Sequence, residues 1–447
     1  MKINLPENAK KIIDILEKNS FECYAVGGCV RDTLLGLEPS DWDFTTNAEP
    51  DEIEKCFCEF KTLSIGKRYG TVAVIIDGQV YEITTYRFDG EYTDSRHPNK
   101  VNFSKNLKDD LLRRDFTVNA MAYNPKFGIV DYFGGEKDLQ YKVLRCVGDT
   151  DKRFKEDALR ILRALRFASK YGFSIELKTQ RAVFDNKNFI NNISAERISA
   201  ELLRLLCGDY VDAVLRMYKE VIAVIIPELS GTFNFDQRSP HHNRNLYNHI
   251  VCAVKNIESD PVLRLTMLLH DIGKPITMKT DKNGRGHFYN HPKVGVGISR
   301  RVMKRLCLSN EVIDEVSILI FHHDDRLKPD KIMLKHMLNE IGTYEFERLM
   351  KVQYADICAQ SPYKREEKFA LHKEVVSLYN SILENKECFS LDTLEINGKD
   401  IISLGVNRGE NIGKILNELL EMVICEEIEN EREKLIYKAK EIIKNLD

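Results

Sequence analysis

The sequence predicts an α+β fold, in which a small mixed sheet with helices is followed by an all-helical remainder. Two apolar runs, TVAVIID and QVYEITTYR, flank the dipeptide Asp77-Gly78, which favours a tight β-hairpin. From about residue 151 onward strand patterns largely vanish and apolar residues recur at helical spacing. The sheet is therefore expected within residues 1–148.

The elements of this first part alternate between helix and strand. MKINLPENAKKIIDILEKN is predicted to be an amphipathic helix, and FECYAVGG a short strand that breaks at Gly27-Gly28 before the helix CVRDTLLG. DWDFTT is predicted as a second strand. The polar stretch DGEYTDSRHPNKVNFSKN, which follows the hairpin, is predicted to be a long mobile loop.

The remainder is predicted to be helical, with two breaks. RFKEDALRILRALRFASKYG is expected to form a helix whose apolar stripe comprises Ala158, Ile161, Leu162, Leu165 and Phe167. PELSGTFNFDQRSPHHNRN is predicted as a linker because it is rich in turn-forming residues, and QSPYKREEK as another break. These features divide the chain into a head at 1–148, a neck at 149–227, a body at 228–364 and a tail at 365–447.

Composition excludes several classes of protein. The 447 residues are 43% hydrophobic and 30% charged, which excludes long disorder, collagen-like chains and disulfide miniproteins. The net charge of −3 means that a polyanion would have to meet a local basic face. The 11 cysteines are scattered, as is typical of reduced thiols, and no uncharged apolar run approaches a membrane span. We expect a soluble, cytoplasmic protein with no membrane partner.

Acidic residues close to a glycine turn form the first candidate site. Asp41 and Asp43 are two apart in a predicted strand and therefore point to the same side, where they can hold a divalent cation. Glu82, in the hairpin, could supply a third oxygen ligand. Gly27-Gly28 offers bare backbone N–H groups to a phosphate. A Mg²⁺ site beside a phosphate cradle suggests phosphoryl or nucleotidyl transfer.

Each of these signals alone is more often a solvated strand or a plain turn, but their order is informative. The sequence resembles the class II tRNA nucleotidyltransferases, or CCA-adding enzymes, which share a polymerase-β-like head with bacterial poly(A) polymerases. The resemblance covers most of the chain and includes GGCVRD, SDWDFTT, YEITTYRFDGEYTDSRHP, LLRRDFTVNAMAY, VDYFGGEKDL, RFKEDALRILRALRF and LEINGKDIISLGVNRGENIGKILNELL.

The resemblance implies roles for these residues in adding CCA to tRNA from CTP and ATP. Asp41 and Asp43 would hold two Mg²⁺ ions, one activating the RNA 3′-hydroxyl and the other holding the triphosphate, with Glu82 as a further carboxylate. The residues implied to meet the nucleotide are Gly27, Gly28, Arg31, Arg113, Arg114, Asp115 and Asn119.

The resemblance also implies that Asp157 and Arg160 select the base without a nucleic-acid template. At i and i+3 on a helix they would share a face, and together they match the exocyclic amine and ring nitrogen of cytosine or adenine. For an arbitrary Asp/Arg pair, an exposed salt bridge would be the better interpretation. The basic residues expected to meet the nucleotide or the RNA are Arg163, Arg166, Lys170, Arg197 and Arg204.

A second candidate site contains histidines and aspartates at the ends of predicted helices. The seven residues are His249, His270, Asp271, His291, His322, His323 and Asp356. Their mixed imidazole and carboxylate donors, without thiolates, suit a mononuclear or dinuclear transition-metal site. The series resembles the HD phosphohydrolases, which implies a metal such as Mn²⁺, Ni²⁺ or Co²⁺ and a phosphate held by Lys274. His241 and His242, in the predicted linker, are assigned no role.

Several functions stay open at the level of sequence. Addition of A alone and poly(A) synthesis use a similar head, although the acidic helical tail argues against poly(A) polymerase. The complete DGEYTDSRHPNKVNF segment disfavours addition of CC alone. A function of another class is metal-dependent phosphohydrolysis with an RNA-binding head, against which the intact Asp41/Asp43 pair argues. The oligomeric state, the tRNA path and the substrate of the HD site are also open.

Overall fold

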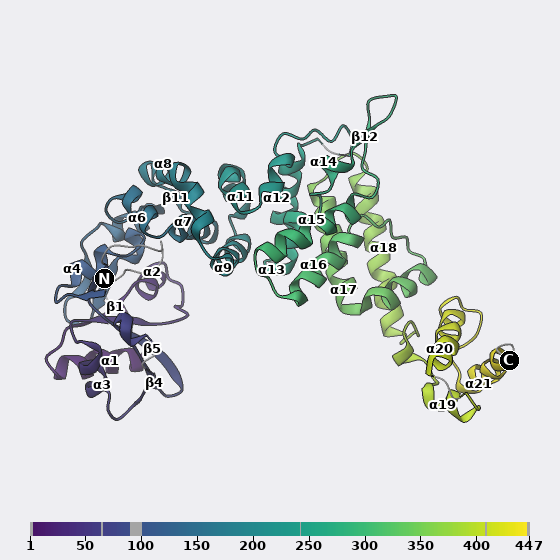
Figure 1. Ribbon diagram of the computed structural model, residues 1–447, viewed down its shortest axis with the longest axis horizontal. Helices are drawn as coiled ribbons and strands as arrows, with labels where there is room; N and C mark the ends of the chain where they lie inside the picture. Colours follow the sequence, from purple (N-terminus) through teal and green to yellow (C-terminus); the bar gives the residue numbers. More distant parts are fainter. Residues whose placement is uncertain (1–2, 64–65, 90–100, 242, 407–408, 445–447) are drawn as a thin grey trace. The chain divides into compact units, whose positions relative to one another are not determined.

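The computed structural model describes residues 3–63, 66–89, 101–241, 243–406 and 409–444 (Figure 1). The chain forms two compact units, Met1–Pro227 and Glu228–Asp447. A sheet with helices lies in the first unit and helices dominate the second, so the predicted α+β class is confirmed. The finer division into four parts stays a prediction.

A seven-stranded mixed sheet forms the centre of the first unit. Its strand order is β3 (Lys61–Leu63), β4 (Thr71–Ile76), β5 (Gln79–Thr85), β2 (Asp43–Thr46), β1 (Cys23–Val26), β8 (Met121–Asn124) and β9 (Gly128–Asp131). Strands β2 and β5 pair in parallel, whereas the other neighbouring strands pair antiparallel. This parallel pair brings the carboxylate segment of β2 beside the hairpin strand β5.

The predicted hairpin and strand-to-helix turn are both present. Asp77 and Gly78 have φ angles of 50° and 79°, the left-handed conformation that a two-residue turn between β4 and β5 requires. Strand β1 ends before Gly27, whose φ is 82°, and α2 (Gly28–Leu34) begins immediately afterwards. The backbone therefore turns sharply where a phosphate cradle is predicted.

Helices cover the sheet and continue beyond it. The helices of the first unit are α1 (Glu7–Lys18), α2, α3 (Pro50–Cys56), α4 (Leu107–Leu112), α5 (Gly135–Gln140), α6 (Thr150–Glu156), α7 (Leu159–Tyr171), α8 (Leu177–Asn186), α9 (Ala195–Leu206), α10 (Val211–Met217) and α11 (Lys219–Ile225). Short 3₁₀ turns occupy Lys67–Tyr69, Thr117–Asn119 and Lys187–Asn192, and β10 (Val143–Leu144) pairs with β11 (Ser174–Ile175). The predicted stripe of α7 is buried throughout.

Three predictions for the first unit were wrong in detail. RFKEDALRILRALRFASKYG forms two helices, because Asp157 has extended dihedral angles between α6 and α7. Asp41 lies before β2 and outside the strand. The predicted loop contains paired strands at its ends, β6 (Arg87–Asp89) and β7 (Val101–Phe103), and its middle, 90–100, lies outside the described residues.

The second unit is built almost entirely of helices. They are α12 (Leu246–Asn256), α13 (Pro261–Leu269), α14 (Lys274–Thr277), α15 (His291–Arg305), α16 (Asn310–His322), α17 (Lys331–Ala359), α18 (Arg365–Glu384), α19 (Gly398–Ser403), α20 (Gly409–Ile424) and α21 (Arg432–Lys444). Helix α17 bends at Gly342, where φ is 77°. Strands β12 (Lys279–Thr280) and β13 (Gly286–His287) form a small ribbon, and 3₁₀ turns occupy Pro227–Thr232 and Leu391–Thr393.

The predicted linker between the units is packed against protein. Leu229, Thr232 and Gln237 are fully buried, because the turn-rich sequence lies over the second unit instead of extending into solvent. His242 of the same segment lies outside the described residues. The cysteines are free thiols, as expected.

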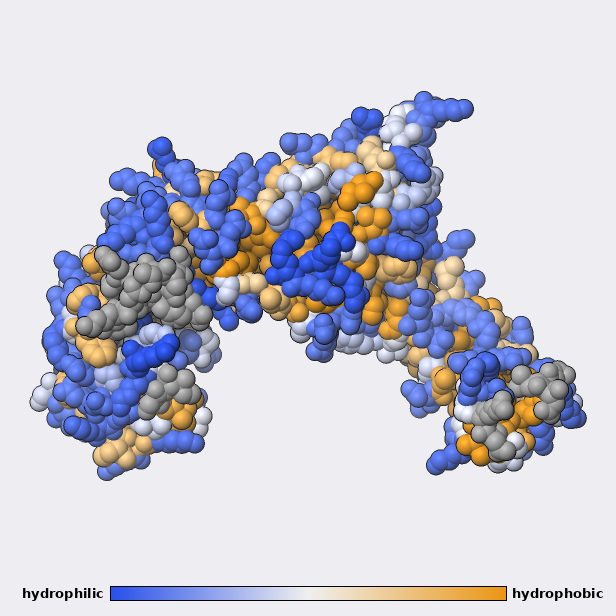
Figure 2. Space-filling model, in the orientation of Figure 1, coloured by the Kyte–Doolittle hydropathy of each residue, from blue (hydrophilic) through white to orange (hydrophobic). Residues whose placement is uncertain are grey.

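Hydrophilic side chains cover much of the visible face of each unit, with hydrophobic patches over the helices of the second (Figure 2). In the described part of the chain, no helix combines the length and apolarity that crossing a membrane requires.

Candidate functional site

Three acidic side chains meet at the parallel pair of strands in the first unit. Asp43 opens β2 and lies directly opposite Glu82 of β5 in the register, and Asp41 precedes it by two residues. Burial raises the pKa of Asp43 to about 6, and the charges of Asp41 and Glu82 add to this effect, whereas Arg114 opposes it. Such concentrated negative charge is the environment that a divalent cation neutralises.

The carboxylates of the first unit do not form a closed metal cage. Among the described residues, the three-residue groups whose ligand atoms lie within 4.8 Å of one another all belong to the second unit. A cation at Asp41 and Asp43 would therefore need further oxygen ligands, which water or a bound phosphate can supply. An open site of this kind suits a metal that also contacts its substrate.

Gly27 allows an arginine to approach the turn between β1 and α2. A Cβ atom at Gly27 would lie 2.9 Å from Nη1 of Arg114, and the positive φ of this residue also disfavours a side chain. Gly28 begins α2, and a Cβ atom at Gly28 would lie 3.6 Å from Nη2 of Arg31. Backbone N–H groups and two guanidinium groups are thus brought together at the predicted phosphate cradle.

Asp110, which the sequence analysis missed, holds the arginine pair. Its buried Oδ1 accepts hydrogen bonds from Nε (2.9 Å) and Nη2 (2.7 Å) of Arg113, and its Oδ2 accepts from Arg114 (3.3 Å) and Thr45 (3.1 Å). Burial alone would raise the pKa of Asp110, but the two arginines lower it. The signal in the sequence was the acidic pair that precedes LLRRD, since two adjacent arginines need a nearby anion when half-buried.

A chain of hydrogen bonds connects α2 to α7 through Asp115. Arg31 donates to Oδ1 of Asn119 (2.5 Å) and to Oη of Tyr171 (2.9 Å), while Asn119 and Arg163 donate to Asp115 at 3.0 and 2.8 Å. Burial would raise the pKa of Asp115, but Arg163, Asn119 and a backbone N–H lower it to about 2. Arg31, Asp115 and Asn119, three of the predicted nucleotide contacts, are therefore parts of one hydrogen-bonded network.

Asp157 and Arg160 are each oriented by another charged residue. Nη2 of Arg197 lies 3.1 Å from Oδ2 of Asp157. Arg160 is buried, donates to the carbonyl oxygen of Arg113 (3.1 Å) and pairs with Glu156 (3.2 Å). The prediction that Asp157 shares a helical face with Arg160 was wrong, because Asp157 lies in the break before α7. Both side chains nevertheless line the same cavity.

This cavity of about 900 Å³ gathers most of the predicted residues of the first unit. Glu82 and Arg113 are not among its lining residues. The charged side chains that line it are Arg31, Arg114, Arg160, Arg163, Arg166, Lys170, Arg197 and Arg204, together with Asp32, Asp41, Asp43, Asp115 and Asp157. The excess of cations suits a polyanionic ligand, and Asp41 and Asp43 suit a metal bound to that ligand.

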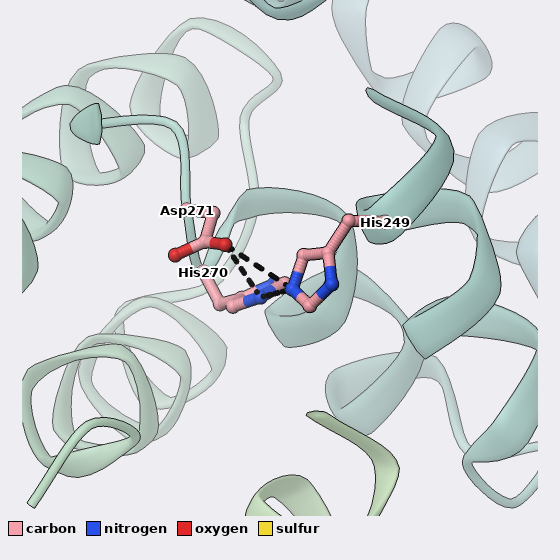
Figure 3. Close-up of side chains that lie close together, drawn as sticks. All are labelled: His249, His270 and Asp271. Atoms are coloured by element: carbon pink, nitrogen blue, oxygen red, sulfur yellow. Dashed lines mark hydrogen bonds and ion pairs between the residues drawn. The ribbon is translucent and has the colours of Figure 1, made fainter. Parts of the chain in front are cut away.

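The second unit contains a buried cluster of imidazoles and carboxylates (Figure 3). Nε2 of His249 lies 3.3 Å from Nε2 of His270 and from Oδ2 of Asp271, and 2.9 Å from Oδ1 of Asp356. His270 lies 3.2 Å from the same Asp271 oxygen. Burial would lower the pKa of His270, but the carboxylates of Asp271 and Asp356 raise it to about 10.

The other oxygen of Asp271 belongs to a second group of ligands. Its Oδ1 lies 3.4 Å from Nε2 of His291 and 3.5 Å from Nε2 of His323, and these two imidazole nitrogens are 3.2 Å apart. Lys274 contacts Oδ2 of Asp271 at 2.7 Å. One carboxylate thus faces two sets of ligand atoms, an arrangement that suits a dinuclear site.

Backbone carbonyl groups orient the imidazoles. Nδ1 of each of four histidines faces a carbonyl oxygen, which leaves Nε2 to face the centre of the cluster. These histidines are His249, His270, His291 and His323. Such outer partners fix the tautomer of metal-binding histidines. His322 is not brought into the cluster, because its Nδ1 bonds to Asp325 (2.7 Å).

The cluster opens into a separate cavity of about 740 Å³. His291, His323 and Asp356 form part of its wall, together with His241, the cations Lys274, Arg285, Arg326 and Lys368, and the acidic residues Asp324 and Asp325. Positive charge next to candidate metal ligands suits an anionic substrate such as a phosphate ester. His241, which the sequence analysis left without a role, is one of these residues.

Comparison with known proteins gives the family. Residues 23–145 match the poly A polymerase head domain, 172–231 the probable RNA and SrmB-binding site of polymerase A, and 295–439 the putative tRNA nucleotidyltransferase domain 2. The CCA-adding enzyme of Ligilactobacillus salivarius is 32% identical over 98% of each chain. The chain belongs to the family of CCA-adding enzymes.

Other relatives in the CCA-adding enzyme family match part or all of the chain. The enzyme of Staphylococcus saprophyticus is 46% identical over 220 residues, so this match spans only about half of the relative, 55% of its length. The crystal structure of the Bacillus stearothermophilus CCA-adding enzyme in complex with CTP is 27% identical, covers 98% of this chain and 97% of that one, and has a TM-score of 0.71. The fold of the whole chain is therefore that of CCA-adding enzymes.

Proposed function

We propose that the protein adds CCA to the 3′ end of tRNA, using CTP and ATP and releasing diphosphate. The observation that carries this proposal is the cavity of the first unit, in which the aspartate pair, the glycine turn and eight basic side chains converge. Support comes from the full-length relative named as a CCA-adding enzyme and from the similar structure that contains CTP.

In this proposal Asp41 and Asp43 hold Mg²⁺, with Glu82 as a neighbouring carboxylate. The bound metal supplies Lewis-acid activation of the attacking 3′-hydroxyl and neutralisation of the triphosphate. Arg31 and Arg114, with the backbone of Gly27-Gly28, bind the triphosphate. The RNA 3′-hydroxyl gives its proton to water and its oxygen forms a bond to the α-phosphorus, while the bond from that phosphorus to the departing diphosphate breaks.

Base selection is proposed to depend on Asp157 and Arg160. A carboxylate accepts from the exocyclic amine of cytosine or adenine, and a guanidinium donates to the adjacent ring nitrogen. Uracil and guanine present a carbonyl group in place of the amine. Arg197 orients Asp157, and Glu156 orients Arg160. Both side chains are therefore held in position before a nucleotide binds.

Nucleotide addition to defined transcripts tests the proposal. The purified protein is given tRNA transcripts that end at the discriminator base, at C or at CC, with CTP and ATP supplied separately and together. We expect both nucleotides to be incorporated and addition to stop after three residues. Unlimited A tails would indicate a poly(A) polymerase, and addition only to the CC transcript an A-adding enzyme.

A second candidate activity is metal-dependent hydrolysis of phosphate esters by the buried imidazoles and carboxylates of the second unit, which we call the HD cluster. The specific observation in its favour is that the two oxygens of Asp271 face two different ligand groups beside a basic cavity. The proposed ligand set is His249, His270, Asp271, His291, His323 and Asp356, without His322. Lys274 would bind a phosphate oxygen.

Metal analysis and hydrolysis of nucleoside cyclic phosphates test this second activity. The wild-type protein, reconstituted with Mn²⁺, Ni²⁺ or Co²⁺, is expected to hydrolyse the substrate, and Asp271→Ala to lose both metal and hydrolysis. Asp392→Ala, an exposed residue of the same unit, is the control. Equal rates for wild type and Asp271→Ala would refute the hydrolase proposal while leaving CCA addition unaffected.

A further inference from the structure

A third group of possible ligands lies outside both sites, between α17 and α20. Nε2 of His336, on α17, is 3.5 Å from Oε1 of Glu421, on α20. Sγ of Cys425, one turn after Glu421, is 3.5 Å from the same oxygen. All three ligand atoms lie within 4.8 Å of one another, and the side chains are exposed or half-buried.

The distances between these atoms match the edges of a metal tetrahedron. Zn²⁺ binds nitrogen and oxygen at about 2.0–2.2 Å and thiolate sulfur at about 2.3 Å, so a tetrahedral site has N···O edges of about 3.4 Å and S···O edges of about 3.6 Å. Both observed separations, at 3.5 Å, lie close to these values. The third pair, Nε2 of His336 and Sγ of Cys425, lies within 4.8 Å. A shift of at most about 1.2 Å therefore closes it to the tetrahedral edge of about 3.6 Å.

We infer that His336, Glu421 and Cys425 form a site for a borderline transition-metal ion such as Zn²⁺. One nitrogen, one oxygen and one sulfur ligand select this class of metal over Mg²⁺ or Ca²⁺, which prefer oxygen. Cys425 binds as the thiolate and gives its proton to solvent. The fourth coordination position faces solvent and takes water.

The site would link α17 to α20 close to a group of charged side chains that already joins them. Lys331 and Lys335 of α17 pair with Glu426, which lies just beyond the end of α20 and is about half exposed. Exposed ion pairs of this kind restrain geometry weakly because solvent screens them. Coordinate bonds from His336 on α17, from Glu421 on α20 and from Cys425, the residue after α20, would fix the end of α20 against α17.

The spectrum of bound Co²⁺ tests the inference. The HD cluster contains no thiolate, so a cobalt–thiolate charge-transfer band reports the proposed site and not that cluster. We expect the band in wild type and in the control Cys58→Ser, which removes an exposed cysteine of the first unit. We expect the band to disappear in Cys425→Ser. In His336→Gln, Co²⁺ binding should be at least about tenfold weaker.

Stoichiometry and amide exchange provide independent measurements on the full chain. Wild type should bind one more Zn²⁺ than Cys425→Ser, and Zn²⁺ should slow hydrogen exchange in α20 of wild type only. No thiolate band in wild type, a band that persists in Cys425→Ser, or equal Zn²⁺ stoichiometry in the two proteins would each overturn the inference. Circular dichroism of the variants, which change half-buried residues, verifies that they are folded.

Discussion

At the scale of single residues, removal of the Asp41 carboxylate should reduce nucleotide addition without unfolding the protein. Its side chain is exposed and lies before β2, so Asp41→Ala should leave the fold intact. Loss of a metal-binding carboxylate should reduce nucleotide addition by at least about a hundredfold. The measurement is the initial rate of CTP incorporation, with Glu38→Ala as an exposed acidic control. Substantial activity in Asp41→Ala would contradict the proposed metal site.

Arg160 should control which base is added. A well-placed pair of hydrogen bonds to a base contributes about 1–3 kcal/mol of discrimination, so Arg160→Ala should raise the relative incorporation of UTP and GTP roughly 10- to 100-fold. Competition between the four nucleoside triphosphates measures this ratio. The control is Arg181→Ala, an exposed arginine of α8. Unchanged discrimination between the four nucleotides would contradict the proposed role of Arg160 in base selection.

Asp115 should make the first unit sensitive to acid. Its pKa is lowered to about 2 in the folded protein, against about 4 when unfolded. A carboxylate with a lowered pKa stabilises the folded state above its unfolded pKa, here by about 2–3 kcal/mol, and this stabilisation disappears as pH falls from about 4 to about 2.

Urea unfolding of the first unit at several pH values measures the effect. The difference in unfolding free energy between wild type and Asp115→Asn should shrink across that interval. A difference that does not depend on pH would show that the charge of Asp115 is not what stabilises the network with Arg163 and Asn119.

At the scale of elements, the turn between β1 and α2 depends on Gly27. An alanine there must adopt a φ of 82° and displace Arg114, whose Nη1 would be 2.9 Å from the new Cβ. Gly27→Ala should therefore lower the unfolding free energy by about 1–3 kcal/mol and weaken CTP binding about tenfold.

Gly78→Ala is the matched control for this turn. Gly78 has a similar φ of 79°, but a Cβ there meets no atom within 4 Å. The control should lose comparable stability through backbone strain while its affinity for CTP, measured by calorimetry, stays unchanged. Equal loss of CTP affinity in both variants would show that general destabilisation, and not Arg114, explains the effect.

At the scale of the whole molecule, two compact units with separate sites should respond separately to metals. The HD cluster lies within Glu228–Asp447, so Ni²⁺, which suits imidazole ligands, should stabilise that unit more than the first. At a free concentration about 100 times Kd, one bound ion adds about 2.7 kcal/mol. Calorimetry of the full chain should show one of two transitions rising with metal, and a smaller rise in Asp271→Asn, in which only the proposed site at His336, Glu421 and Cys425 is intact. A shift of both transitions would contradict independent units.

Much of the fold and chemistry follows from local sequence patterns. The Asp77-Gly78 hairpin, the break at Gly27 and the buried stripe of α7 were predictable because turn conformation and helical periodicity are properties of neighbouring residues. The aspartate pair and the histidine series were recognisable because metals and phosphates require particular donor types, whatever surrounds them.

The sequence by itself determined the fold class, the family resemblance and the kinds of groups at both sites. Only the tertiary structure decided that Asp110 anchors the arginine pair, that Arg197 holds Asp157, and that His323 joins the HD cluster while His322 turns to Asp325. The physical reason is that these contacts depend on the direction in which packing points each side chain, and that direction is set by helices distant in the sequence.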